Sequence, residues 1–138
     1  MKTFLKTISL TLIIIFLVSC SNDITKIGSG IDSKYEGKYS GAINRKHQNG
    51  IIEDVRATFT INNDGSVKGS VTYFGGSNPE DVELSKEMII KNSDNSYSAE
   101  INFTGLKKYT FTFNNNMLDL NIVNEDNSVT SGQLIQSK

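Results

Sequence analysis

Few side chains in this sequence are of the types that catalysis needs. His47, the only histidine, lies in a polar stretch, 45–50, that indicates a hairpin tip, where a solvated loop residue is the alternative to a general base or metal ligand. Neighbouring residues on a strand point to opposite faces, so adjacent carboxylates do not readily share a site. Three such pairs occur, Glu53-Asp54, Glu80-Asp81 and Glu125-Asp126. We therefore expect no enzyme, no catalytic residue and no cofactor.

The chain also offers poor sets of metal ligands. Its single Cys and single His exclude Cys-based zinc sites and paired-His motifs. The Asn- and Asp-rich segments 62–65 and 124–128 lack the Asp-x-Asp-x-Asp-Gly spacing with a distal Glu that binds calcium, and turn formation explains them better. A formal net charge of −1, without a long run of like charges, gives no electrostatic footprint for nucleic acid. We expect no metal site and no nucleic-acid partner.

The only cysteine, Cys20, follows a segment unlike the rest of the chain. Lys2 and Lys6 precede an apolar, nearly uncharged stretch, 8–18, which as a helix of roughly 16 Å is too short for a bilayer core of about 30 Å. The pattern is typical of a secretory signal peptide, and an uncleaved anchor with an incidental cysteine is the alternative.

The end of this segment, Leu17-Val18-Ser19-Cys20, resembles the lipobox of bacterial lipoproteins. The resemblance implies diacylglyceryl transfer to the Cys20 sulfur, cleavage after Ser19 and acylation of the new amino terminus, palmitate being a typical acyl group. Two or three acyl chains anchor a protein firmly to a membrane. Ser21, rather than Asp, follows the cysteine, which in the Gram-negative sorting scheme implies the outer membrane. The expected location is thus the bacterial cell envelope.

Three parts of the chain follow from these patterns. Residues 1–19 form the signal peptide, which is cleaved. Residues 20–34 comprise the lipidated Cys20 and a flexible tether, since the segment has few large apolar groups and several Gly and Ser. Residues 35–138 form one domain, because a chain of 138 residues is too short for two domains of ordinary size.

Within 35–138 the apolar residues recur with a period of two, which predicts strands. Turn-forming segments such as 62–65, 92–96, 114–116 and 124–127 separate the runs. About eight short strands joined by hairpin-length loops predict an all-β, antiparallel, eight-stranded up-and-down barrel, whose closure would leave no exposed edges. A β-sandwich is the alternative.

The first strand, Gly37-Lys38-Tyr39-Ser40-Gly41, resembles the opening Gly-x-Trp of the calycin group, the lipocalin-like and avidin-like barrels, with Tyr39 in place of the Trp. The hairpin segment 64–73 is similar to one of the avidin type. This resemblance implies a small barrel that binds a ligand without catalysis.

The face expected to point inward interleaves aromatic residues with Gly and Ala, and Lys86 is its one charged exception. Its aromatic residues are Tyr35, Tyr39, Phe59, Tyr73, Tyr97, Phe103, Tyr109, Phe111 and Phe113. Such alternation either fills a tapering barrel or leaves a pocket. In a pocket, the hydroxyls of Tyr39, Tyr73 and Tyr97 would orient a small, neutral, apolar ligand.

Two functions remain open from the sequence. The first is a membrane-anchored envelope lipoprotein with a non-enzymatic binding barrel that takes such a ligand. The alternative is a protein-interaction or protease-inhibitor-like barrel with a filled core that contacts an envelope protein through its loops. Phe74, beside Gly75 and on the opposite parity to Tyr73, is the expected partner contact.

Overall fold

Nine antiparallel strands form the domain in the computed structural model, which describes residues 27–75, 78–103 and 105–138. Two short 3₁₀ turns accompany them, η2 (Ser33–Tyr35) and η3 (Lys86–Met88). The strands are β1 (Gly37–Lys46), β2 (Ile52–Ile61), β3 (Val67–Tyr73), β4 (Glu80–Leu84), β5 (Ile90–Lys91), β6 (Ser96–Asn102), β7 (Leu106–Asn114), β8 (Met117–Val123) and β9 (Val129–Gln136).

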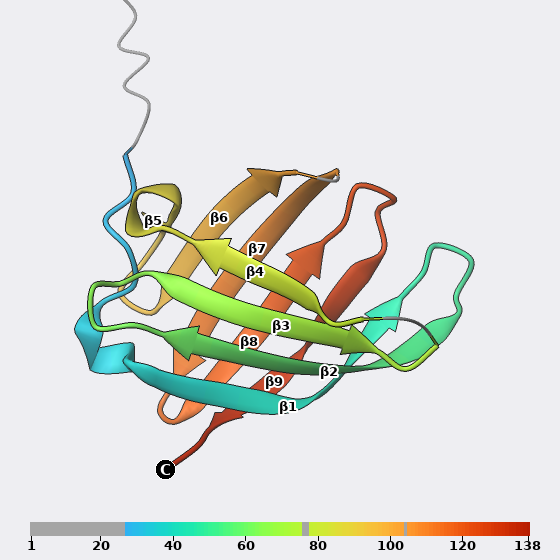
Figure 1. The fold of residues 1–138 in the computed structure, drawn as a ribbon, viewed down its shortest axis with the longest axis horizontal. Coiled ribbons are helices and arrows are strands. Elements are labelled where there is room, and N and C mark those ends of the chain that lie inside the picture. The colour runs from blue at the N-terminus through green and yellow to red at the C-terminus, as the bar shows by residue number, and fades with distance from the viewer. Residues whose placement is uncertain (1–26, 76–77, 104) are drawn as a thin grey trace, which may run out of the picture.

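All nine strands belong to one sheet, in the order β4-β3-β2-β1-β9-β8-β7-β6-β5. The neighbours are consecutive hairpins, except that the first strand pairs with the last, for example Tyr39 with Gln136 and Lys46 with Val129. This pairing joins the segment β1–β4 to the segment β5–β9 (Figure 1). The all-β, antiparallel, up-and-down character predicted from the sequence is confirmed.

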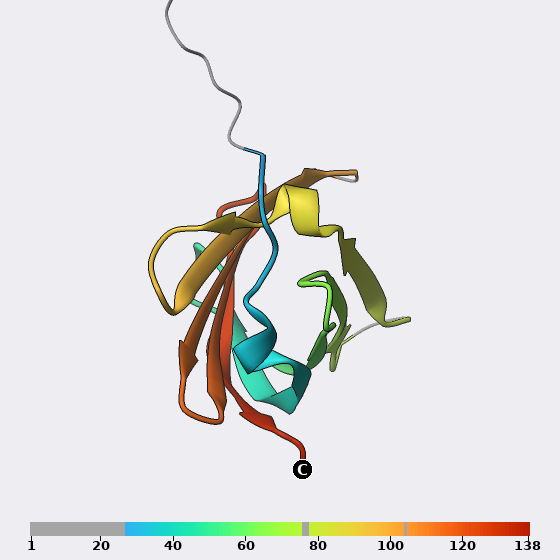
Figure 2. The same ribbon diagram turned by 90° about the vertical axis from the view of Figure 1, so that its left-hand side faces the viewer.

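The expected closed, eight-stranded barrel is wrong. The sheet has nine strands and curls into a half-barrel, with β4 and β5 as its two free edges (Figure 2). The reason lies in the connection between them. After Leu84 the chain turns through η3, which shifts the alternation by one residue, so that Ile89 is buried instead of Ile90. Lys86, expected on the inward face, is exposed.

The N-terminal segment 27–36 packs against one end of the sheet. The Gly28 N–H donates to the Glu87 carbonyl at 2.8 Å, and the Ile31 N–H donates to the Gly65 carbonyl at 2.9 Å. Ile31 is buried in the core. The described part of the expected tether, 27–34, is therefore part of the folded domain. We call this the anchor end; residues 47–51, 74–75, 78–79 and 124–128, with residues 103 and 105, lie at the opposite, loop end (Figure 1).

A five-residue motif, Asn-x-Asp-(Gly/Asn)-Ser, recurs at the turns 62–66, 92–96 and 124–128. At the first and last, the Asp carboxylate accepts bonds from both the backbone N–H and the hydroxyl of the Ser two residues on. These bonds lower the pKa of Asp64 and Asp126. Side chains that bond their own backbone in this way specify tight turns, which explains why the hairpins could be predicted.

Aromatic side chains fill the interior in two groups. Toward the anchor end, the rings of Tyr35 and Phe113 stack at 4.2 Å, and Tyr39 and Tyr97 meet Phe113 edge-on. Toward the loop end, Phe59 meets Phe111 edge-on at 5.8 Å, and the Tyr109 ring stacks on that of Phe111. Such pairs contribute about 0.5–1.5 kcal/mol each beyond burial alone.

One glycine on the inward face, Gly69, makes room for one of these rings. A Cβ atom built on Gly69 would lie 2.4 Å from Phe59 Cε1. Phe59 is opposite Gly69 in the β2–β3 pair and is fully buried. The space left by the small residue is therefore occupied by the neighbouring ring and is not a pocket for a ligand.

Gly69→Ala is expected to lower the free energy of unfolding by about 1–3 kcal/mol, because the Phe59 ring must shift in a packed core. Chemical denaturation measures this change. Gly75→Ala is the matched control and is expected to be near neutral, since among the described residues its Cβ would meet only a Glu53 carboxylate oxygen at 3.6 Å. Unchanged stability of Gly69→Ala would mean that the interior has room to spare.

Candidate binding surfaces

The three tyrosines proposed to line a ligand pocket do not come together. Tyr39 and Tyr97 are buried toward the anchor end, and Tyr73 lies half-buried near the loop end. The Tyr39 hydroxyl donates to the Tyr35 carbonyl at 3.0 Å. The Tyr97 hydroxyl approaches Asp32 without a hydrogen bond of good geometry. These residues belong to a packed core and do not form a shared site.

A polar pocket of about 310 Å³ lies at the loop end. Arg45, near the end of β1, lines this pocket and makes two hydrogen bonds and one contact with an aromatic ring. Its Nε donates to Ser128 Oγ at 2.9 Å, and its Nη2 donates to Asp126 Oδ2 at 3.0 Å. Its guanidinium lies 5.2 Å from the centre of the Tyr73 ring. These bonds use two of the five guanidinium N–H groups, and Asp126 supplies a carboxylate beside the cation.

Lys107 of β7 forms an ion pair with Glu80 of β4 in the same pocket. The pair joins the two halves of the sheet at the loop end. Sequence reasoning missed Lys107, although a signal was present. Alternate residues of a strand lie on the same face, so Lys107 lies on the inward face with Tyr109 and Phe111.

Apart from Phe103, four large apolar side chains are exposed on loops or strand ends at the loop end. We call them the loop rim: Ile51, Ile52, Phe74 and Leu106. Single exposed apolar residues are common, whereas several on neighbouring loops mark a binding surface. The sequence analysis identified only Phe74 among them.

Phe74 is the aromatic residue of the loop rim. Its side chain is 64% exposed, and its N–H donates to the Asp54 carbonyl at 3.2 Å. That register makes Ile52 and Arg56 its diagonal neighbours on the outer face. The Arg56 guanidinium lies 5.8 Å from the ring centre. Aromatic and arginine side chains are the residues most enriched at the energetic centres of protein interfaces.

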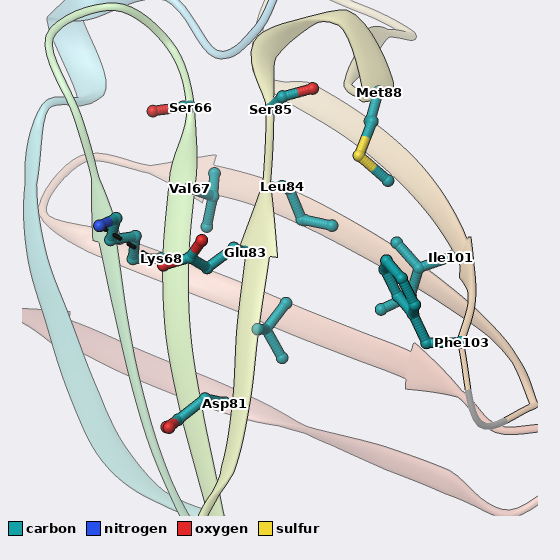
Figure 3. A pocket seen from close by; sticks show the side chains of 11 residues that line it. Ser66, Val67, Lys68, Asp81, Glu83, Leu84, Ser85, Met88, Ile101 and Phe103 are labelled. Carbon is teal, nitrogen blue, oxygen red and sulfur yellow. Dashed lines mark ion pairs between the residues drawn. The ribbon is translucent and has the colours of Figure 1, made fainter.

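A second hollow, of about 540 Å³, lies between the two halves of the sheet, along β4 (Figure 3). We call it the seam groove. Its apolar walls are Val67, Val82, Leu84, Met88, Ile101 and Phe103. Phe103 was expected on the inward face, but it is 87% exposed because the sheet does not close over it.

The remaining predicted residues carry no assembled chemistry. His47 lies in the β1–β2 hairpin with its Nε2 3.3 Å from Glu53 Oε2. Within 27–75, 78–103 and 105–138, no group of three or more His, Cys, Asp or Glu side chains could hold a metal ion. In the same residues no helix is long and apolar enough to cross a membrane. Cys20 and the signal peptide lie outside the described residues.

Comparison with known proteins gives no relative for this chain. No protein-family model, no curated protein and no solved structure matches it. We therefore infer function from the geometry of the loop rim, the seam groove and the packed interior.

The filled interior predicts the behaviour of the chain in alkali. Burial raises the pKa of four tyrosines, Tyr39, Tyr73, Tyr97 and Tyr109. The native state favours the neutral phenol, whereas the unfolded chain ionises near pH 10. The stabilisation is complete below that pH and is lost as the pH rises above it. Tyrosinate absorbance should therefore appear together with loss of the strand signal in circular dichroism. Ionisation of these tyrosines near pH 10 with the strand signal intact would mean a solvent-filled interior.

Proposed function

We propose that this chain is a lipid-anchored protein of the bacterial cell envelope whose β-domain binds another protein without catalysis. The observation that carries the proposal is the combination of a filled interior with large apolar side chains exposed on the loop rim. A packed core leaves little space inside for a ligand, so recognition falls to the outer surface. The loop rim supplies an aromatic anchor, Phe74, with Arg56 against its ring.

The position of the anchor supports this arrangement. Six residues separate Cys20 from Ile27, the first described residue. Even fully extended, that span reaches only about 25 Å. Lipid at Cys20 would hold the anchor end near the membrane, and the loop rim at the opposite end would face outward toward a partner. The outer membrane, which Ser21 implies, remains part of the proposal.

A carrier of a small, neutral, apolar ligand is less well supported. It would require a pocket shared by Tyr39, Tyr73 and Tyr97, and these lie at two ends of the interior. The space beside Gly69 is filled by Phe59. A protein partner is therefore the function that the geometry favours.

Lipid attachment is tested by the mass of the protein purified from membranes. We expect the natural chain to begin at Cys20 and to carry added acyl mass. Cys20→Ser should carry no acyl mass and incorporate no labelled palmitate, while Ser21→Ala should keep both. A natural chain that retains residues 1–19 and carries no acyl mass would instead support the uncleaved anchor.

Partner binding at the loop rim is tested by photo-crosslinking in intact cells. A crosslinking residue at position 51 should give a discrete adduct with an envelope protein, and one at position 131 should not. Phe74→Ser combined with Ile52→Ser should weaken binding about tenfold or more and remove the adduct.

Ile135→Ser is the matched control for these rim substitutions. Ile135 is 63% exposed, close to the 64% of Phe74 and the 65% of Ile52, but it lies on β9 toward the anchor end. The adduct should survive this change. No adduct at position 51, or one that is equally sensitive to Ile135→Ser, would contradict the proposal.

A further inference from the structure

The seam groove lies between the free edge of β4 and the part of β6 that the short β5 leaves uncovered. Among residues 27–75, 78–103 and 105–138, β4 pairs with β3 on one side and has no strand on the other. β5 covers β6 only where Ile90 and Lys91 pair with Ser98 and Tyr97. Residues 99–102 of β6 therefore also lack a strand partner on that side. Unpaired edges present backbone N–H and C=O groups that can pair with another chain.

The groove between these edges has apolar walls. Val82 and Leu84 come from β4, Ile101 and Phe103 from β6 and the turn after it, and Met88 from η3 (Figure 3). Met88 and Ile101 are half-buried, and Phe103 is almost fully exposed. An extended chain in this position would cover all three with the side chains of one face.

The groove is bounded at both ends. At the anchor end, η3 and the buried Ile89 lie between β4 and β6, held by backbone bonds from Ser29 to the Ile89 carbonyl. At the loop end, the Lys107–Glu80 ion pair joins β7 to β4. The open length is close to that of β4, whose five residues span about 17 Å. It suits an extended segment of four or five residues.

The charges beside the groove select its occupant. Asp81 and Glu83 point outward from β4, Glu87 from η3 and Glu100 from β6, and all four are exposed. Among the described residues, Lys68 pairs with Glu83 and Lys108 with Glu100, whereas Asp81 and Glu87 have no ion pair. Lys68, which also lines the groove, and Lys108 offset two of these acids, and Lys86 of η3 is a further exposed cation. Asp81 and Glu87 are therefore the carboxylates left to attract basic side chains.

A second copy of this chain is a poor occupant. Pairing two β4 edges would bring Asp81 and Glu83 of one copy beside the same acids of the other. Like charges placed opposite one another destabilise a strand pair. Charged residues on an edge strand commonly prevent such self-association.

We propose that the seam groove binds an extended segment of another protein, with apolar and basic side chains in alternation, which adds as a strand between β4 and β6. The apolar side chains would enter the groove and the basic ones would meet Asp81 and Glu87. Since β4 and β6 run in opposite directions, the added strand pairs antiparallel with one and parallel with the other. This surface is separate from the loop rim, so either can fail its test while the other passes.

The test uses the full chain, lipidated and in detergent micelles, with a fluorescent, end-blocked peptide Lys-Val-Lys-Ile-Lys-Val as the probe. Fluorescence anisotropy should show saturable binding below about 1 mM. Binding should protect the backbone amides of 80–84 and 99–102 from hydrogen exchange. The same peptide N-methylated at every second amide should bind at least about tenfold more weakly, because it lacks the donors that pair with an edge.

Two substitutions separate the contributions of shape and charge. Phe103→Ser should weaken binding about tenfold without loss of stability, because the side chain is exposed. Ile135→Ser is the control and should change nothing. Asp81→Lys should weaken binding of the Lys peptide a few-fold and strengthen binding of a matched Glu-Val-Glu-Ile-Glu-Val peptide.

Several results would overturn the proposal. They include no saturable binding below about 1 mM, equal binding of the N-methylated peptide, and protection confined to residues outside the two edges. A dimer in sedimentation experiments that dissociates on Phe103→Ser would assign the groove to a second copy. Peptide binding to empty micelles equal to that with protein present would assign the signal to the detergent surface.

Discussion

The pairing of the first strand with the last is the interaction on which the rest of this structure depends. Every other pair in the sheet is a local hairpin, whereas β1 and β9 are separated by most of the domain. Their ladder joins two short meanders, brings Phe59 against Phe111, and sets β4 and β6 on either side of one groove. Bringing these two distant strands together costs chain entropy, and burial of the aromatic interior offsets that cost.

The strands and turns could be predicted from the sequence because their signals are local. Alternation marks one face of each strand, and the Asn-x-Asp-x-Ser turns fix where the chain reverses. The prediction that the sheet closes into a barrel was wrong. Closure depends on whether two edges that are distant in the sequence meet, and local patterns do not report that. One residue of offset at η3 buries Ile89 and exposes Lys86, and among the described residues β4 pairs on one edge only.

The candidate site was predictable only in part for the same reason. Phe74 could be identified from its parity, because β3 is regular up to that point. The strand alternation predicts that Phe103 is buried. The side chain is exposed because the sheet does not close over it. Tyr39, Tyr73 and Tyr97 share a face of the sheet but not a place along it. Alternation reports the face of a residue and says nothing of which end of the sheet it occupies.

The docking of the N-terminal segment on the sheet has a mechanical consequence. Any tension on the chain ahead of Ile27 is first borne by the backbone bonds of Gly28 and Ser29 to the loop around η3. It then reaches Ile31 and finally the stacked ring of Tyr35 before β1 is pulled. These contacts can break one after another. Under a pulling force on the N-terminus, this segment would therefore detach before the hydrogen bonds of the sheet break.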